Sequence, residues 1–208
     1  MADVNGFLIV TPNGSGPGSD TSWNAGGCCG SAATDTVDET AFVRQMLSDL
    51  GTIVKVDPRR IYAAGFSNGA MLVYRLACEM SDVFAAVAPV SGPLFYSPCQ
   101  PQQPVSVVHV HGLADTVVPF TGGGDLIPGG FPAIDQGIAT WVRLDGCNDS
   151  AQVVKLDSSI THTAYHSCRA DSAVELYTIE GVGHGWPSSV EFPMPEVIWG
   201  FFLAHPKP

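Results

Sequence analysis

The sequence predicts a single α/β domain over residues 1–208, built on a mostly parallel central sheet with flanking helices. Three observations support this fold class. Short apolar runs alternate with longer segments of helical periodicity, no repeat or linker divides the chain, and 208 residues with 45% hydrophobic content suffice for one core. Because 23 glycines and 16 prolines accompany only 14% charged residues, we also expect many turns and long surface loops.

The chain is expected to begin with one strand and one helix. The apolar run GFLIVTP (residues 6–12), closed by the turn-forming stretch PNGSGPGS, predicts a buried strand of the parallel type. Thr36 and Glu39 have the spacing of a capping box, and an apolar stripe at helical spacing follows them. Gly51 is placed to end this helix.

From residue 60 onward, strands and helices alternate. Apolar runs predict strands at 60–66, 84–92, 104–112 and 173–181, and helical periodicity predicts helices at 69–80, 132–146 and 195–205. The glycine-rich segment TGGGDLIPGG is expected to be a flexible insertion between elements. This order of elements favours one domain with parallel strands.

Charge and hydropathy argue against two classes of partner. The net charge of -11 repels nucleic-acid phosphates and anionic lipid, and no cluster of lysine and arginine offsets it locally. The longest apolar stretches, FAAVAPV and VIWGFFLA, fall well short of the roughly 20 residues that a membrane span needs. We therefore expect a soluble protein that binds neither nucleic acid nor membrane.

The cysteines predict disulfides. They form an even set without a C-x-x-C pair: Cys28, Cys29, Cys78, Cys99, Cys147 and Cys168. Because the spacing of metal ligands is absent, we expect disulfides, an oxidising compartment, no metal and no cofactor. No basic and apolar leader precedes MADVNGFLIV, so secretion is inferred, with a signal peptide either removed or never present.

One motif points to nucleophilic chemistry. The segment from Gly65 to Gly69, GFSNG, fits the pattern G-x-S-x-G between a predicted strand and a predicted helix. On such a corner Ser67 is held in a strained conformation, its hydroxyl is exposed, and amides at the helix start face a developing oxyanion. The context favours a nucleophile over a purely structural turn.

A serine nucleophile requires a base and an acid that orients the base. On this kind of sheet the expected chain order is serine, acid, histidine. Asp115 follows the strand 104–112, and His184 lies between two glycines after the last predicted strand, so both lie at carboxyl ends of strands. The other candidates have structural or solvated interpretations: His109, His111, His162, His166, His205, Asp125 and Asp135.

The sequence resembles the secreted α/β-hydrolase esterases grouped with polyhydroxybutyrate depolymerases and feruloyl esterases, including carbohydrate esterase family one. The resemblance is carried by GFLIVTPNG, SWNAGGCCG, VDPRRIYAAGFSNGAMLVYRLACEMSDVFAAVAPVSG, PVSVVHVHGLADTVVPF and YTIEGVGHGWP, from Gly6 almost to the end of the chain. It implies an α/β-hydrolase fold and an ester hydrolase. Ser67, Asp115 and His184 match the family's triad residue by residue.

The resemblance also implies further roles. The substrate cleft would be lined by Trp23, Phe66, Val118, Pro119 and Trp186, although each could equally be a packing residue. Among the cysteines it implies a bond between Cys147 and Cys168. Adjacent cysteines bond only with strain, so Cys28 and Cys29 are expected to take separate partners from Cys78 and Cys99.

The chain departs from the family at its N-terminal side. Relatives carry additional strands before GFLIVTP, one ending in a His-Gly loop that donates the second oxyanion N–H, and this chain starts after them. The fold is therefore expected to be reduced there, with only the Asn68 amide assigned to the oxyanion hole. Losing one oxyanion donor typically costs ~10²–10³ in turnover, so low activity is expected.

The gap in the sheet suggests two hypotheses. In one, residues 6–12 move across to pair directly with the strand ending at Ala64, because buried backbone groups cannot stay unpaired. In the other, a second subunit covers the exposed edge and forms a homodimer.

The leading functional hypothesis is a serine carboxylic ester hydrolase that acts through an acyl-enzyme on aryl (feruloyl-type) or polymer-linked esters. The alternatives within this class are a polyester hydrolase, for polyhydroxybutyrate or a terephthalate-type polyester, and an acetyl xylan esterase. A different class remains open: a degenerate polymer-binding protein that keeps the hydrolase fold without turnover.

Overall fold

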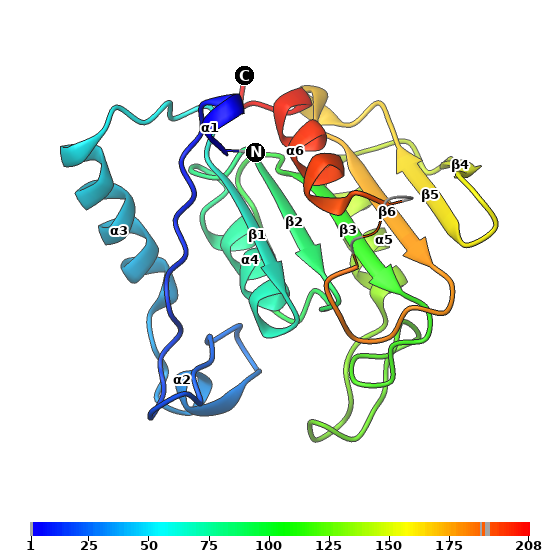
Figure 1. Ribbon diagram of the computed structural model, residues 1–208, viewed down its shortest axis with the longest axis horizontal. Coiled ribbons are helices and arrows are strands. Elements are labelled where there is room, and N and C mark those ends of the chain that lie inside the picture. Colours follow the sequence, from blue (N-terminus) through cyan, green and yellow to red (C-terminus); the bar gives the residue numbers. More distant parts are fainter. Residues whose placement is uncertain (1, 188, 190–191) are drawn as a thin grey trace.

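The computed structural model describes residues 2–187, 189 and 192–208. Within these residues six strands form one sheet in the order β1-β2-β3-β6-β5-β4 (Figure 1). The strands are β1 (Tyr62–Phe66), β2 (Ala86–Val90), β3 (Ser106–Gly112), β4 (Gln152–Lys155), β5 (Ile160–Tyr165) and β6 (Val174–Ile179). Four neighbours, β1, β2, β3 and β6, run parallel, and β5 runs antiparallel to both of its neighbours, β6 and β4. The predicted α/β class with a mostly parallel sheet is confirmed.

Helices cover both faces of this sheet. The helices of the described residues are α1 (Ala2–Asn5), α2 (Gly30–Thr34), α3 (Glu39–Ile53), α4 (Asn68–Glu79), α5 (Ile134–Asp145) and α6 (Met194–Ala204), with the 3-10 turn η1 (Arg169–Asp171). Figure 1 shows α6 in front of the sheet and α4 and α5 behind it. Successive strand residues point to opposite faces. Accordingly Val107 packs with the α4 and α5 cluster, and Val108 packs with α6.

Helix α3 begins and ends differently from the prediction. Its N-cap is Asp38, whose side chain accepts a 2.9 Å hydrogen bond from the Ala41 amide. The Glu39 carboxylate instead accepts from the Asn24 amide at 2.8 Å, a long-range contact that local spacing cannot reveal. The helix also continues past Gly51 to Ile53.

The predicted strand at residues 6–12 is wrong. This segment belongs to no strand, and Leu8, Ile9 and Val10 are 61%, 65% and 45% exposed. The Phe7 ring stacks on Trp199 of α6, with ring centroids 4.0 Å apart, and so fastens the segment outside the sheet. An apolar run indicates a preference for burial, but a strand also needs a neighbour to pair its N–H and C=O groups.

The proposed pairing of this segment with the strand ending at Ala64 is also wrong. Among the described residues β1 pairs with β2 alone, from Tyr62 opposite Ala86 to Phe66 opposite Val90. Strand β1 is therefore an edge of the sheet. The hairpin of β4 and β5 was not predicted, because all four residues of β4 are exposed and carry no apolar pattern.

The cysteine predictions are partly right. The structure confirms the bond between Cys147 and Cys168. It pairs Cys28 with Cys29 and Cys78 with Cys99, so the expectation of separate partners for the adjacent cysteines is wrong.

The positions of the cysteines along helix α4 explain why Cys28 does not pair with Cys78. Cys28 packs beside Met71 near the start of α4, whereas Cys78 lies seven residues further along the same helix. At about 1.5 Å per residue Met71 and Cys78 are roughly 10 Å apart along the helix, so Cys28 packs at the opposite end of α4 from Cys78. Cys99, in the loop after β2, reaches Cys78 with a Cα separation of 5.1 Å.

One buried carboxyl makes stability depend on pH. Asp145, the last residue of α5, is fully buried, and this burial raises its pKa from 3.8 to about 7. Because the folded pKa lies above the unfolded one, the stability contribution of Asp145 is full below about pH 4 and is lost as pH rises through about 7.

We therefore expect Asp145→Asn to stabilise the protein at about pH 8 relative to about pH 4, by more than ~1 kcal/mol, since the amide stays neutral at both values. Urea unfolding of variant and wild type at both pH values measures this difference. Asp149→Asn, an exposed carboxyl four residues later, is the matched control and should change little. Equal effects of Asp145→Asn at both pH values would contradict the assignment.

Candidate active site

Ser67 occupies a sharp corner between β1 and α4. Its backbone has φ 55° and ψ −118°, a sparsely populated conformation that costs about 1–3 kcal/mol for a residue with a side chain. Two glycines allow the approach that holds it there. A Cβ at Gly65 would overlap the Gly69 carbonyl, and a Cβ at Gly92 would overlap the Ser67 carbonyl. The Ser67 amide donates to the Val90 carbonyl at 2.9 Å, which fixes the corner to β2.

The three residues predicted to form a triad lie together. His184 Nε2 is 2.9 Å from Ser67 Oγ, and His184 Nδ1 is 2.8 Å from Asp115 Oδ2. They come from three loops that follow β1, β3 and β6 at the carboxyl edge of the sheet. Since these strands run parallel, segments 117 residues apart in sequence meet at one place.

Asp115 is oriented by its own loop. The residue is 4% exposed, and its Oδ1 accepts hydrogen bonds from the amides of Val117 (2.9 Å) and Val118 (2.8 Å). These two bonds leave Oδ2 directed at His184. The carboxylate therefore has one oxygen for its loop and one for the imidazole.

The His184 loop is held by a residue that the sequence analysis missed. Ser91, fully buried directly after β2, donates its hydroxyl to the Gly185 carbonyl at 3.1 Å. The Phe66 ring lies against the imidazole, with ring centroids 4.8 Å apart. The position of Ser91 at a strand's carboxyl end was the available signal, but its partner lies 94 residues away.

Both the backbone and the side chain of Asn68 take part in the candidate active site. Its amide belongs to the first turn of α4, where N–H groups have no partner within the helix and can face an anion. Its side chain binds the Trp23 backbone at two points, accepting from the amide at 2.7 Å and donating to the carbonyl at 3.0 Å. The residue after Ser67 thus fastens the Trp23 loop to the site.

The Trp23 loop has two more anchors. The Asn24 amide donates to Glu39, which is 1% exposed, and burial raises the pKa of this carboxyl. Arg75 of α4 donates to the Asn24 carbonyl at 2.6 Å and pairs with Glu79 at the same distance. Sequence spacing gave no indication of these long-range contacts.

The predicted cleft residues differ in their surroundings. Trp186 and Phe66 are 43% and 37% exposed, so both present apolar surface near His184, whereas Pro119 and Trp23 are half-buried. The prediction that Val118 lines the cleft is wrong. Its side chain is 1% exposed and packs in a core cluster with Ala25, Cys28, Met71 and Phe131. It therefore cannot line an open cleft, although its backbone supports Asp115.

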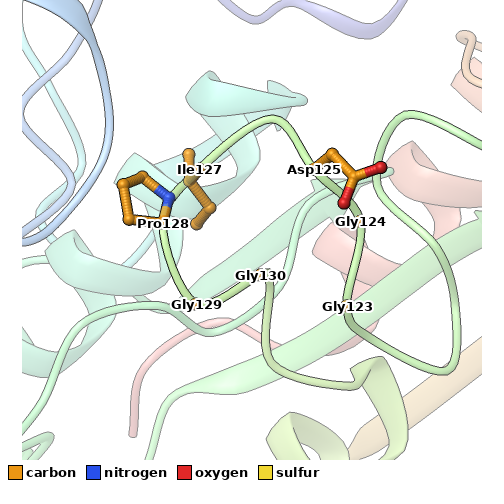
Figure 2. A pocket seen from close by; sticks show the side chains of 7 residues that line it. All are labelled: Gly123, Gly124, Asp125, Ile127, Pro128, Gly129 and Gly130. Carbon is orange, nitrogen blue, oxygen red and sulfur yellow. The ribbon is translucent and has the colours of Figure 1, made fainter.

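A cavity of about 470 Å³ lies in the glycine-rich segment after Pro119 (Figure 2). Its lining consists of Gly123, Gly124, Asp125, Ile127, Pro128, Gly129 and Gly130. None of these residues belongs to the predicted triad. Gly123 and Phe131 exchange backbone hydrogen bonds of 2.8 and 2.7 Å, which close this segment into a loop.

The remaining titratable candidates lie in other settings. His162 binds Glu175 at 2.9 Å, and His205 binds the Phe201 carbonyl at 2.8 Å. His109 and His111 are buried in β3. Within the described part of the chain, no group of three or more His, Cys, Asp or Glu residues could hold a metal ion. No helix of that part is both long and apolar enough to cross a bilayer.

The mainly parallel sheet, the helices on both faces and the serine corner after β1 define an α/β-hydrolase fold. The structure of an acetyl xylan esterase from Aspergillus awamori superposes with a TM-score of 0.61 at 15% identity, covering 90% of this chain and 75% of that one. At this identity the likeness establishes the fold alone.

Two relatives found by sequence similarity carry the names of esterases. Over 207 residues the chain is 29% identical to feruloyl esterase B of Piromyces equi. This alignment covers 92% of this chain and 37% of the relative. It is 33% identical over 120 residues to a bifunctional acetylxylan esterase/xylanase of Neocallimastix patriciarum, covering 58% of this chain and 16% of the relative. The chain thus spans well under half the length of these two relatives. No protein-family model matches it.

We expect Asn68→Ala to loosen the Trp23 loop while keeping the amide at position 68. Loss of two partly buried hydrogen bonds should lower the free energy of unfolding by about 1–2 kcal/mol and speed hydrogen exchange at the Trp23 amide. Urea unfolding and exchange mass spectrometry measure both effects. Asn148→Ala, an exposed asparagine, serves as control. Unchanged exchange at Trp23 would contradict the role of the Asn68 side chain.

Proposed function

We propose that the chain is a serine carboxylic ester hydrolase with Ser67 as nucleophile, His184 as base and Asp115 as the orienting acid. The observation that carries this proposal is the continuous hydrogen-bonded set from Asp115 through His184 to Ser67, with contacts of 2.8 and 2.9 Å. Both distances are within the reach required for proton transfer and orientation. The esterases among its relatives support the same class.

The geometry supports an acyl-enzyme route. Ser67 Oγ attacks the ester carbonyl while His184 Nε2 takes its proton, and His184 then gives that proton to the departing alkoxide. Water attacks the acyl-serine with His184 again as base, and Ser67 recovers its proton as the acid product leaves. Asp115 accepts from His184 Nδ1 and stabilises the imidazolium. The Asn68 amide donates to the oxyanion in both halves of the cycle.

The proposed substrates are aryl esters of the feruloyl type or esters linked to a polymer. Exposed apolar side chains near His184, those of Trp186 and Phe66, support an acyl group with an aromatic ring. A relative named feruloyl esterase supports the same choice. Acetylated xylan is the second candidate, favoured by the relative named acetylxylan esterase/xylanase. Polyhydroxybutyrate and terephthalate-type polyesters complete the set to be tested.

We expect Ser67→Ala to abolish hydrolysis of a para-nitrophenyl ester and labelling by a fluorophosphonate, because the attacking oxygen is gone. Stopped assays with both reagents measure this. Ser158→Ala, at an exposed serine between β4 and β5, leaves the triad intact and should keep both hydrolysis and labelling, so it serves as the control. Hydrolysis retained by Ser67→Ala would remove Ser67 as nucleophile.

The same assays separate the enzyme from the degenerate polymer-binding alternative. A polymer-binding protein would bind xylan or polyester without a burst of acyl-enzyme, whereas a hydrolase shows the burst. Comparing methyl ferulate, para-nitrophenyl acetate, polyhydroxybutyrate and an aromatic polyester ranks the substrate classes.

Two further proposals concern the compartment in which the protein acts and its oligomeric state. Three disulfides support action outside the cell, in an oxidising compartment. Strand β1 is an edge with no second strand partner among the described residues, and this supports a homodimer, since an open edge strand offers free N–H and C=O groups to a second copy. Multi-angle light scattering is expected to give twice the chain mass of 21.8 kDa. A monomer at all concentrations would contradict the dimer.

A further inference from the structure

Behind the Asp115 loop, three buried side chains form a continuous series of hydrogen bonds. They are Tyr74 of α4, which is 1% exposed, and His109 and His111 of β3, which are fully buried. Tyr74 Oη is 3.0 Å from His109 Nδ1, and His109 Nε2 is 3.2 Å from His111 Nδ1. We propose that this buried imidazole chain (Tyr74, His109 and His111) positions the Asp115 carboxylate for His184. The inference rests on the function proposed above.

The end of the buried imidazole chain fixes the direction of every hydrogen bond in it. His111 Nε2 lies 2.9 Å from the Val118 carbonyl, which can only accept, so this nitrogen carries the proton. His111 Nδ1 must then accept from His109 Nε2–H, and His109 Nδ1 must accept from the Tyr74 hydroxyl. Each neutral ring has one donor and one acceptor, and both are used.

The buried imidazole chain ends at Asp115, the acid of the triad. The backbone of Val118 lies between His111 and Asp115, since its carbonyl accepts from His111 and its amide donates to Asp115 Oδ1 at 2.8 Å. His111 Nε2 is also 3.6 Å from Asp115 Oδ2, the oxygen that binds His184. One imidazole N–H therefore faces both the loop and the carboxylate that the loop orients.

Burial keeps both histidines neutral. It lowers the pKa of His109 well below 6.5, with His111 adding to the effect, and it lowers the pKa of His111 against the opposing influence of Val118 and Asp115. The charged or titratable groups that face His111 are His109, Asp115 and His184. Neutral rings suit this place because each supplies one donor without adding charge beside the Asp115–His184 pair.

Packing alone does not require these residues. Apolar side chains of similar size would fill the same core, whereas each buried polar atom left unpaired costs about 1–3 kcal/mol. The buried imidazole chain is complete only because it ends on Val118 and Asp115. Removing its last donor should let the loop and the carboxylate reorient, which would impair the chemical step more than substrate binding.

The first test compares two substitutions at His111. His111→Gln keeps an N–H donor near the position of Nε2, whereas His111→Leu removes it at similar volume. With para-nitrophenyl acetate, we expect His111→Leu to lower kcat by about 10–100-fold with little change in KM, and His111→Gln to recover much of the loss. Equal kcat values for the leucine variant and wild type, or no recovery with glutamine, would overturn the proposal.

The second test uses Tyr74→Phe, which removes the first donor and changes the shape least. Alone it should lower kcat in the same direction but by less than His111→Leu. Added to His111→Leu it should lower kcat no further, because the buried imidazole chain is already broken. Independent, multiplying effects on kcat would contradict a connected chain. Tyr74→Phe also keeps the test available where His111→Leu does not fold.

A matched control comes from the same core. Trp141 is fully buried, its ring lies 5.9 Å from that of Tyr74, and its indole N–H donates to the Val105 carbonyl at 2.7 Å. Trp141→Phe removes a buried hydrogen bond that does not lead to Asp115. We expect it to lower Tm without lowering kcat. A fall in kcat equal to that of His111→Leu would assign the effect to general loss of packing.

A proton resonance separates failure of this inference from failure of the proposed function. The His184 Nδ1–H proton facing Asp115 should give a far-downfield signal in wild type, whether or not the protein turns over. Absence of both hydrolysis and fluorophosphonate labelling in wild type would reject the proposed function. In that case, loss of the signal in His111→Leu with retention in His111→Gln still supports the positioning role, and an unchanged signal overturns it.

Discussion

The candidate site depends on one close approach between backbones. Strand β1 and helix α4 meet so tightly that a side chain at Gly65 would overlap the Gly69 carbonyl. Beside this contact Ser67 adopts a conformation with positive φ, and its hydroxyl reaches His184 Nε2. The next peptide begins a helix, so the same corner presents an unpaired amide beside the hydroxyl. Gly92 lets the loop after β2 pass directly behind this corner.

Asp115 is the point at which the exposed and buried parts of the site meet. On the solvent side its Oδ2 binds His184, which in turn reaches Ser67. On the core side its loop receives the N–H of His111, the last member of a hydrogen-bonded series that starts at Tyr74 in α4. Helix α4 therefore supports the site twice, through Asn68 in its first turn and through the side chain of Tyr74 further along the helix. A site supported in this way gains precision because the loops that carry the triad are fastened to the rigid sheet and helices.

Sequence reasoning succeeded where chemistry is encoded locally and failed where it depends on a distant partner. The strand–serine–helix corner was predictable because glycine spacing and apolar periodicity both lie within a dozen residues. The apolar run at residues 6–12 was misassigned, because a strand is defined by its neighbour and, in the described part of the chain, β1 pairs with β2 alone. Val118 was expected to face substrate, yet its side chain is buried and its backbone amide donates to Asp115. The partners of Cys28 and Cys29 likewise depended on distances along α4.

The sequence by itself determined the α/β class, the chain order of Ser67, Asp115 and His184, and the bond between Cys147 and Cys168, the last through its resemblance to known esterases. Each follows from patterns that neighbouring residues or a related motif carry. Only the tertiary structure decided that β1 is an edge, that Asn68 clamps Trp23, and that two histidines of β3 connect Tyr74 to the Asp115 loop. Those contacts join residues far apart in the chain, and a side chain's hydrogen-bond partner is fixed by where the fold brings it.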